Sequence, residues 1–340
     1  MILAALLLVA ACSGSGEDDE STGGRPAASG SGSASGEAAG AFPVTVEHRF
    51  GATTVEDAPT RVATVGLTDH DAVLALGVTP VGTTAWYGDH PFGVWPWAQD
   101  ELGDAEPILL GDSEDIDPEA ILEADPDVIL ALYSGLTEEQ YDDLSRYAPV
   151  IAPPAEYDDY GISWQEQTQT IGDVLGKPDE AAGLVEDTEA LISEAAADHP
   201  ELDGATTVVA SAAEGVYVYS PQAAVSRVLT DLGLVVPEDL VELIGEDFGA
   251  EVSLEQVDLV DLDVVLWLDA SDDLPPFTVD AYTSLPVATE GREVRLATTG
   301  ALAGGSFISV LSLPVILDQL VPMLTAAVDG DPTTEVPPEA

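Results

Sequence analysis

A fourteen-residue pattern occurs twice in this chain, as Glu119-Ala-Ile-Leu-Glu-Ala-Asp-Pro-Asp-Val-Ile-Leu-Ala-Leu132 and as Glu255-Gln-Val-Asp-Leu-Val-Asp-Leu-Asp-Val-Val-Leu-Trp-Leu268. Each copy predicts a short helix, an acidic turn and a buried strand. Asp117 or Ser253 can cap the helix, and Pro118 suits the first helical position. A helix–strand unit of this kind can recur by chance, but the constant offset of 136 residues favours two similar lobes.

Short apolar strands alternate with helical patterns on both sides of this repeat. Residues 61–66, 128–132, 206–210 and 264–268 are typical of strands, and residues 71–76 follow the first of them as a helix. Such alternation predicts an α/β fold. We expect two Rossmann-like α/β lobes, an N-terminal one over 42–176 and a C-terminal one over 201–329, with a disordered tail over 330–340.

One long helix is predicted between the lobes, within residues 177–200. One helical face carries Ala181, Leu184, Val185, Thr188, Leu191, Ile192 and Ala195. A helix from Pro178 to His199 is roughly 33 Å long at a rise of about 1.5 Å per residue. A single helix of this length makes a stiff hinge.

The charge of the chain is strongly negative. Its 340 residues include 8 lysine and arginine against 64 aspartate and glutamate side chains, for a formal net charge of −56. Such a surface repels nucleic acid and anionic lipid, so neither is expected as a partner. Self-repulsion of this size destabilises a compact chain in dilute buffer and salt relieves it, which favours a saline or alkaline habitat over compositional drift. Hydrophobic residues still make up 46% of the chain, which is enough for a core.

The first residues are typical of a lipoprotein leader. The apolar run from Ile2 to Ala11 is too short to cross a bilayer but suits a signal peptide, here residues 1–11. The tetrad Val9-Ala-Ala-Cys12 looks like a bacterial lipobox, in which the cysteine becomes the lipidated first residue. The alternative is an incidental cysteine in a discarded leader. Since Cys12 is the one cysteine of the chain, disulfides play no part in the fold.

A flexible tether is predicted over residues 12–41. It consists mainly of serine, glycine, alanine and acidic residues, which cannot bury enough surface to fold. A flexible chain of this length has a root-mean-square reach of roughly 30 Å. Pro314 and Pro322 interrupt the C-terminal apolar stretch, so no later membrane segment is predicted. We expect an extracytoplasmic monomer, lipid-anchored through Cys12 to the outer face of the cytoplasmic membrane.

Aromatic side chains gather in one irregular loop of the N-terminal lobe. The stretch from Gly77 to Glu119 is about twenty residues longer than its counterpart from Gly233 to Glu255. The additional segment contains Trp86, Tyr87, Phe92, Trp95 and Trp97. Aromatic residues in such a loop either cover an edge of the core or line a ligand site, and we favour the ligand site.

An ordered set of motifs over roughly residues 43–328 resembles a known family. Besides the lipobox and tether, the motifs are Pro59-Thr-Arg-Val-Ala-Thr-Val-Gly66, the run from Asp125 to Ala131, Trp164-Gln-Glu-Gln-Thr-Gln-Thr-Ile-Gly172 and Gly300-Ala-Leu-Ala-Gly-Gly-Ser-Phe-Ile-Ser-Val-Leu-Ser-Leu313. They are similar to iron-siderophore ABC transporter substrate-binding proteins, in particular to the actinobacterial lipoprotein branch. The resemblance implies two α/β lobes, a helical hinge and a ligand cleft between the lobes. It also implies a ferric siderophore as ligand, an ABC permease as partner, no cofactor and no catalytic activity.

The resemblance also suggests which side chains meet the ligand, because ligands of such folds lie at the carboxyl ends of strands. Flat aromatic side chains suit a bulky chelate whose iron is already ligated, and tyrosine hydroxyls with an arginine can hydrogen-bond its chelating oxygens. The expected ligand-binding residues are Trp86, Tyr87, Trp95, Trp97, Tyr133, Tyr219, Arg227, Trp267 and Phe307. For Trp267, which replaces Ala131 of the first repeat, a place in the core is the alternative.

Glu119 and Glu255 occupy equivalent positions in the two repeats, each in the expected first turn of a helix. A glutamate there complements the helix dipole in any protein. In the family that the chain resembles, one surface glutamate of each lobe pairs with arginines of the permease. The resemblance therefore implies that Glu119 and Glu255 dock the permease.

Other classes of function fit the sequence less well. A hydrolase would use Gly111-Asp-Ser113 as its nucleophile block with Asp198-His199 as partner, but no oxyanion motif accompanies them. Metal-ion binding is disfavoured because the histidines are scattered without paired ligand spacing. These histidines are His48, His70, His90 and His199. Haem or a corrinoid stays an alternative ligand, because the same fold holds them.

The cations of the chain bear on the charge of the ligand. Ferric tris-catecholates are strongly anionic, whereas ferric tris-hydroxamates are neutral or singly positive. The globular part offers Arg49, Arg61, Arg146, Lys177, Arg227, Arg292 and Arg295. Of these, Arg227 suits a place in the cleft, with Arg61 as a second choice, and one arginine compensates a multiply charged anion poorly. We therefore predict a preference for hydroxamate-type ferric siderophores.

Overall fold

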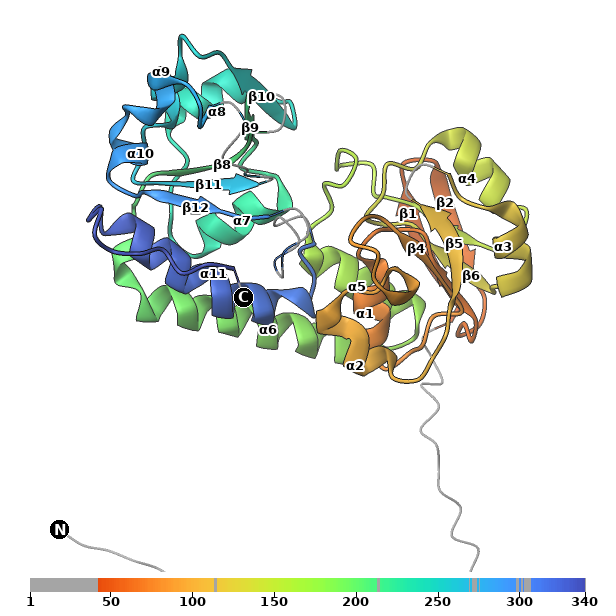
Figure 1. The fold of residues 1–340 in the computed structure, drawn as a ribbon. Helices are drawn as coiled ribbons and strands as arrows, with labels where there is room; N and C mark the ends of the chain where they lie inside the picture. The colour runs from red at the N-terminus through yellow and green to blue at the C-terminus, as the bar shows by residue number, and fades with distance from the viewer. Residues whose placement is uncertain are drawn as a thin grey trace, which may run out of the picture. The chain divides into compact units, whose positions relative to one another are not determined.

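The computed structural model describes residues 42–339, apart from 113–114, 213–214, 269, 271–273, 275, 298–299, 301 and 303–306. The predicted signal peptide, Cys12 and the tether lie outside the described residues. The described residues form a single unit in which two α/β lobes share one long helix (Figure 1). This arrangement confirms the predicted fold class. Within the described ranges, no helix is long and apolar enough to span a membrane.

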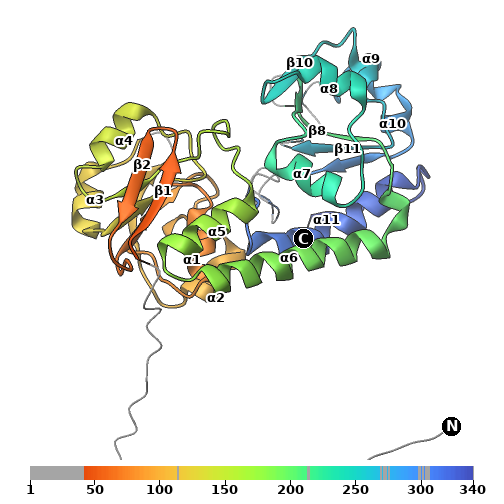
Figure 2. The ribbon, with the colours of Figure 1, turned by 180° about the vertical axis from the view of Figure 1, so that it is seen from behind.

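The N-terminal lobe is built on a five-stranded parallel sheet in the order β5-β4-β3-β6-β7. Its strands are β3 (Val62–Thr64), β4 (Gly82–Ala85), β5 (Ile108–Asp112), β6 (Val128–Leu130) and β7 (Val150–Ile151). Its helices are α1 (Asp69–Ala75), α2 (Gln99–Leu102), α3 (Pro118–Ala124), α4 (Glu138–Leu144) and α5 (Trp164–Val174), with the 3₁₀ turns η1 (Pro91–Gly93) and η2 (Pro96–Ala98). An antiparallel hairpin of β1 (Val44–His48) and β2 (Gly51–Val55) stands at the front of this lobe in Figure 2.

The C-terminal lobe holds a second five-stranded sheet, in the order β10-β9-β8-β11-β12. Its strands are β8 (Thr207–Ser211), β9 (Val216–Tyr219), β10 (Gly249–Val252), β11 (Val264–Leu268) and β12 (Glu293–Arg295). Its helices are α7 (Ala224–Asp231), α8 (Glu238–Ile244), α9 (Asp280–Thr283), α10 (Pro286–Thr289) and α11 (Ser312–Val328), with the 3₁₀ turns η3 (Pro200–Leu202) and η4 (Val257–Val260). Because β9 is antiparallel to both β8 and β10, this sheet is mixed. The strands of the repeat, β6 and β11, take the same place in the two sheets.

The two copies of the repeat differ before their strands. In the first copy, the Asp117 carboxylate accepts the backbone N–H of Glu119 at 2.8 Å, and Pro118 opens α3. In the second copy, the Ser253 hydroxyl bonds the Gln256 side chain at 3.2 Å, and η4 begins only after Gln256. The predicted helix turn at Glu255 and its Ser253 cap are therefore wrong, because that hydroxyl is directed to a side chain and leaves the helical N–H groups uncapped.

The acidic turns of the repeat match closely. The Asp127 carboxylate accepts the backbone N–H of Thr60 at 2.8 Å, and the Asp263 carboxylate accepts that of Thr206 at 2.9 Å. Each threonine hydroxyl donates to the same carboxylate. In both lobes the repeated aspartate thus ties the start of its own strand to the start of the parallel strand beside it.

The predicted inter-lobe helix is α6 (Pro178–Asp198). Its first half packs on the N-terminal core through Ala181 and Leu184, and its second half packs on the C-terminal core through Ile192. Leu191 departs from the predicted apolar face, because 43% of its surface is exposed. Figures 1 and 2 show α11 running beside α6, and the two helices are in contact. A helix anchored in both cores is suited to hold the lobes at a fixed spacing.

The chain before α11 makes a second connection between the lobes. Val310 is buried in the N-terminal core, and Leu311 packs against the same core. After α11, the Glu339 carboxylate accepts the backbone N–H groups of Ala297 at 3.1 Å and Leu302 at 2.5 Å. The disordered tail expected over 330–340 stays a prediction.

Candidate functional site

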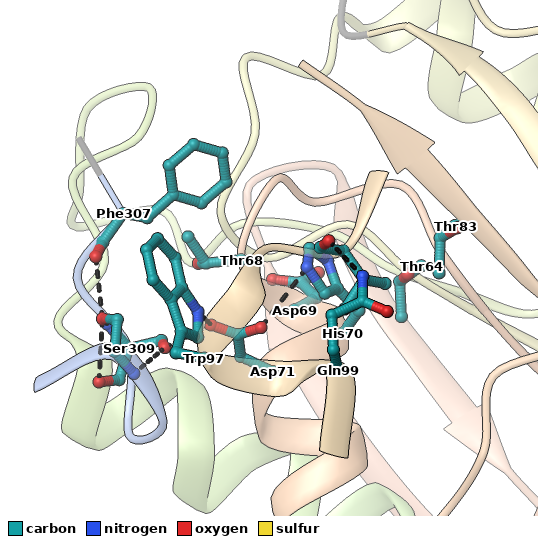
Figure 3. Close-up of polar contacts among 12 residues, drawn as sticks. Thr64, Thr68, Asp69, His70, Asp71, Thr83, Trp97, Gln99, Phe307 and Ser309 are labelled. Carbon is teal, nitrogen blue, oxygen red and sulfur yellow. Dashed lines mark hydrogen bonds and ion pairs between the residues drawn. The ribbon is translucent and has the colours of Figure 1, made fainter. Parts of the chain in front are cut away.

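The order of the N-terminal sheet reverses between β3 and β6, where ligands of such sheets lie. Asp69, the first residue of α1, is fully buried at this point (Figure 3). Its carboxylate accepts the backbone N–H groups of Leu132 at 2.8 Å and Tyr133 at 3.1 Å, and the Gln167 amide at 2.6 Å. Burial raises the pKa of Asp69, and these hydrogen bonds act in the opposite direction. The carboxylate therefore fixes the chain after β6 and with it the position of Tyr133.

Tyr133 and Arg227 come together from different lobes. Arg227, in the first turn of α7, donates Nη2 to the carbonyl oxygens of Gly161 at 3.0 Å and Ile162 at 3.2 Å. The Tyr133 ring packs edge-on against Tyr160, with ring centroids 5.7 Å apart. Burial raises the pKa of Tyr133 to about 12, and the positive charge of Arg227 acts against this rise. The arginine thus crosses to the N-terminal lobe and is a cation beside a neutral phenol.

Two cavities that share lining residues open beside this contact. The larger, of about 450 Å³, is lined by Arg49, Ala155, Tyr157, Asp158, Asp159, Tyr160 and Phe248. The smaller, of about 250 Å³, is lined by Glu156, Tyr157, Asp158 and Gly161 of the N-terminal lobe and by Ser220, Gln222, Arg227, Gly245, Glu246, Asp247 and Phe248 of the C-terminal lobe. Since both lobes line the smaller cavity and both cavities include Tyr157 and Phe248, they form one candidate cleft between the lobes.

Two aromatic residues of the cleft, Tyr157 and Phe248, are fixed by contacts with neighbouring side chains. The Tyr157 hydroxyl donates to Glu166 at 2.6 Å, and this bond is the main reason why the pKa of Tyr157 is raised. Arg49 donates to the Tyr157 carbonyl at 2.9 Å and pairs with Asp159. Phe248 is 44% exposed and packs edge-on against Tyr219, with ring centroids 5.7 Å apart. An exposed phenylalanine opposite a fixed tyrosine leaves two aromatic faces for an apolar ligand.

A third cavity, of about 250 Å³, lies at the switch point itself. It is lined by Val65, Leu67, Ile116, Ser134, Gly135, Leu136, Thr137, Gln140 and Tyr160. Tyr160 lines both this cavity and the one of about 450 Å³. Its φ of 58° is in the left-handed region, which an aromatic residue adopts at a cost in free energy. Gly135 allows the ring to come close, because a Cβ there would lie 3.1 Å from the Tyr160 hydroxyl.

The predicted aromatic loop forms a packed cluster with Phe307. Trp95 stacks on Trp97 at a centroid distance of 5.1 Å, and Phe307 lies 4.9 Å from the Trp95 ring. Figure 3 shows how Asp71 holds the cluster: its carboxylate accepts Trp97 Nε1 at 2.9 Å and the Ser309 hydroxyl at 2.5 Å. The cluster therefore pins the segment before α11 to the N-terminal lobe.

The family described as periplasmic binding protein matches residues 62–278. A periplasmic solute-binding protein from Mycobacterium smegmatis is 32% identical over 84% of this chain and 98% of that one, with a TM-score of 0.73. The chain belongs to the periplasmic binding protein family.

Structural neighbours of this periplasmic binding protein include iron-uptake proteins, as the resemblance in sequence predicts. Streptococcus pneumoniae PiaA, solved in complex with ferrichrome, is 29% identical over 84% of this chain and 99% of that one, with a TM-score of 0.75. Staphylococcus aureus FhuD2, solved with bound ferrioxamine B, is 19% identical over 79% of this chain and 100% of that one, with a TM-score of 0.64, and shows a likeness of fold alone. No curated protein matches the sequence. The family is non-catalytic, so this solute-binding protein is not an enzyme.

The predicted ligand residues separate into two groups in the structure. Tyr133 and Arg227 lie together, Arg227 lines the cleft, and Tyr219 packs against Phe248 of the cleft. The other six residues line none of the three cavities above: Trp86, Tyr87, Trp95, Trp97, Trp267 and Phe307. Of these, Trp86 is 38% exposed, whereas Trp95 and Phe307 are each 1% exposed because they pack on one another.

Trp267 needs a correction. It is fully buried on β11, which lies between β8 and β12. Its Nε1 donates to the Tyr282 hydroxyl at 3.0 Å, and its ring packs against Phe277 and Tyr282. The core alternative is therefore right for this residue, since a strand in the middle of a covered sheet presents its large side chains to helices and loops of the same lobe.

The residues that line the cleft were mostly missed in the sequence. Tyr157 and Tyr160 lie in the loop after β7, and Phe248 directly precedes β10. The rule that ligands meet the carboxyl ends of strands would have pointed to Tyr157 and Tyr160, but β7 spans two residues and gives no periodic signal. Aromatic residues beside aspartates in a proline-flanked loop are the available sequence clue.

The residues considered for a hydrolase or a metal-ion binder do not form a common site among the described residues. Ser113 is outside the described residues, and His199 bonds Glu201 at 3.1 Å at the end of α6. His70 is buried beside Asp71 at 3.3 Å, and His48 bonds Thr53 at 2.9 Å. Within the ranges that the structure describes, three or more histidine, cysteine, aspartate or glutamate side chains do not converge on a metal position.

Proposed function

We propose that this periplasmic binding protein captures a ferric siderophore, with a hydroxamate type favoured over a catecholate type, and delivers it to an ABC permease. The observation that carries the proposal is the cleft lined by Tyr157 and Phe248 from opposite lobes, with Arg227 beside them. Its larger part, about 450 Å³, is within the range of cavities that hold organic ligands.

The chemistry of the lining supports a chelate whose iron is already ligated. Tyrosine and phenylalanine rings offer flat apolar area with few rotamers to restrict. Arg227 has five N–H donors, and its hydrogen bonds to Gly161 and Ile162 all come from Nη2. Nε and Nη1 therefore remain to hydrogen-bond the chelating oxygens of a bound complex.

The placement of cations supports the hydroxamate type. Arg49 and Arg227 are the cations that line the cavities described above. The other arginines that the structure describes are engaged elsewhere: Arg61 with the Ala124 and Asp125 carbonyls, Arg146 with Asp143, Arg292 with Glu290 and Arg295 with Glu293. Since Arg49 is already paired with Asp159, the cleft has too little positive charge for a strongly anionic catecholate complex.

A fluorescence titration tests this function. Ferrichrome, a ferric tris-catecholate, haem and cobalamin are added in turn to the protein in molar NaCl, and quenching of the tryptophan emission is followed. We expect saturable one-to-one binding of ferrichrome and weaker or no binding of the other three. Tighter binding of the catecholate would overturn the hydroxamate preference, and binding of haem or cobalamin alone would overturn the siderophore assignment.

We further propose that Cys12 carries the lipid anchor that holds the protein outside the cytoplasmic membrane. The support is the tetrad Val9-Ala-Ala-Cys12 before a tether of small and acidic residues. Expressed in a bacterium with lipoprotein processing, the wild type should partition into detergent and Cys12→Ala should remain in the aqueous phase. Equal partitioning of the two would contradict the anchor.

A further inference from the structure

The candidate cleft is lined by carboxylates from both lobes. Glu156 and Asp158 come from the loop after β7, and Glu246 and Asp247 come from the loop before β10. Within the described ranges, none of the four takes part in an ion pair, because the arginine salt bridges go to other acids. Like charges on the two walls of one cavity raise its free energy, and a cation placed between them lowers it.

The cations of the cleft do not compensate these four carboxylates. Arg49 pairs with Asp159, and Arg227 directs Nη2 to main-chain carbonyl oxygens while its field acts mainly on Tyr133, Tyr157 and Asp231. The lining of the cleft therefore carries a net negative charge even after Arg49 and Arg227 are counted.

The cleft is a built site and not merely an acidic surface. Aromatic rings from both lobes line it, and the Tyr133 ring packs edge-on against Tyr160 of the lining. The Tyr133 side chain is 7% exposed, and its hydroxyl makes no hydrogen bond to any residue that the structure describes, so this donor remains for a ligand. The chelate thus has an aromatic-lined place, and the four carboxylates belong to the same lining.

We infer that the cleft selects ferric siderophores that carry a positive charge over neutral complexes with the same chelate. The ligand class is a tris-hydroxamate with a free ammonium arm, and the arm lies between the carboxylates of the two loops. This inference rests on the proposed function of the same cleft. A siderophore whose ammonium lies within several ångströms of four carboxylates in a solvated cleft should bind about tenfold more tightly than a neutral complex with the same chelate.

Two probes with one chelate test the inference. Ferrioxamine B carries a terminal ammonium, and its N-acetyl derivative is neutral with the same iron site. Calorimetric titration of the wild type should give about tenfold tighter binding of the ammonium form in moderate salt. The ratio should approach one in molar NaCl, where the Debye length is about 3 Å.

A pair of double variants separates the local charge from the field of the whole protein. Glu246→Gln with Asp247→Asn removes two cleft charges, and Glu238→Gln with Glu242→Gln removes two exposed charges of α8 that do not line the cleft. The first variant should lower the preference at least threefold, and the second should leave it as in the wild type. Equal lowering by both variants would overturn the inference, because the preference would then come from the overall charge.

The probes also distinguish the two proposals. Equal affinity of the wild type for both probes in moderate salt would overturn the charge selection and leave siderophore binding intact. Absence of binding for both probes and for ferrichrome would overturn the proposed function and this inference with it.

Discussion

Tyr133 of the N-terminal lobe and Arg227 of the C-terminal lobe lie close enough to interact electrostatically. Asp69 fixes the backbone of Tyr133, and two carbonyl oxygens of the N-terminal lobe fix the guanidinium of Arg227. The phenol is buried and neutral, and the guanidinium is partly buried and charged. Such a pair places a hydroxyl beside a cation and carries a single charge.

The ionisation of Tyr133 makes stability fall at alkaline pH. Its pKa is about 12 in the folded protein against 10.0 for an exposed tyrosine, so the unfolded chain loses this proton first as the pH rises. The stabilisation is fully present below pH 10.0 and is lost as the pH rises towards 12. We expect a loss of roughly 2–3 kcal/mol in the unfolding free energy from this group.

Urea unfolding of the wild type and Tyr133→Phe across this pH interval measures the effect. The phenylalanine variant should lose less stability, whereas Tyr147→Phe, at a 40% exposed tyrosine, should follow the wild type. Identical pH dependence of the wild type and Tyr133→Phe would show that burial of this phenol is not linked to folding.

For single residues, the sequence predicts some members of the candidate site and misses others, and the difference has a physical reason. Arg227 could be placed because it follows a strand and a turn at the start of a helix, which points it to the edge of the sheet. Trp267 could not be separated from a ligand residue, because a large aromatic residue in a buried strand fits both places. Tyr157 and Phe248 gave no signal, because their loops acquire a common cleft only when the two lobes meet.

At the scale of elements, the contact of α5 with α6 requires a glycine. A Cβ at Gly172 would lie 2.3 Å from the Ala181 Cβ and 3.1 Å from the Lys177 carbonyl oxygen. Gly172→Ala should therefore lower the unfolding free energy by about 1–3 kcal/mol through overpacking.

A second glycine provides the matched control. Gly183 is inside α6, and a Cβ there would have no atom within 4 Å. Gly183→Ala should raise the unfolding free energy by about 0.5–1 kcal/mol, because alanine is the better helix former. Thermal or urea unfolding measures both variants, and a neutral Gly172→Ala would contradict the close packing of α5 on α6.

The elements that the sequence predicted best are the long periodic ones. The inter-lobe helix was expected from Pro178 to His199 and extends from Pro178 to Asp198, and the strand over 264–268 has the predicted bounds. Shorter elements were less predictable, because β7 spans two residues and η4 is one 3₁₀ turn. In such elements the capping and tertiary contacts decide the conformation, and a repeat in sequence does not reveal them.

Delivery to a permease would use one exposed glutamate of each lobe. Glu119 and Glu255 are exposed, and each is near an exposed leucine, Leu122 at 68% and Leu254 at 43%. Glu119→Lys or Glu255→Lys should abolish siderophore uptake by cells and leave the affinity for ferrichrome unchanged. Glu123→Lys, also exposed on α3, is the charge-matched control and should retain uptake. Loss of ferrichrome binding in either docking variant would place that glutamate at the ligand instead.

At the scale of the whole molecule, the net charge of −56 governs stability in solution. Screening shortens the reach of carboxylate repulsion from about 10 Å at 0.1 M salt to about 3 Å at 1 M. The melting temperature should therefore rise markedly as NaCl increases to molar concentration, with the steepest rise at low salt. Calorimetric scans at a series of NaCl concentrations measure it, and a flat or falling curve would contradict adaptation to salt.

We propose that a ferric siderophore binds between the lobes, against Phe248. Titration of ferrichrome into Phe248→Ala, with Leu254→Ala as control, tests it most directly, because the two side chains are 44% and 43% exposed and only Phe248 lines the cleft. Loss of an aromatic contact worth about 1.5–3 kcal/mol should weaken binding by at least about tenfold in Phe248→Ala and leave Leu254→Ala as the wild type. Equal affinity for ferrichrome in the wild type and both variants would contradict this placement of the ligand. Absence of ferrichrome binding in all three proteins would contradict it as well.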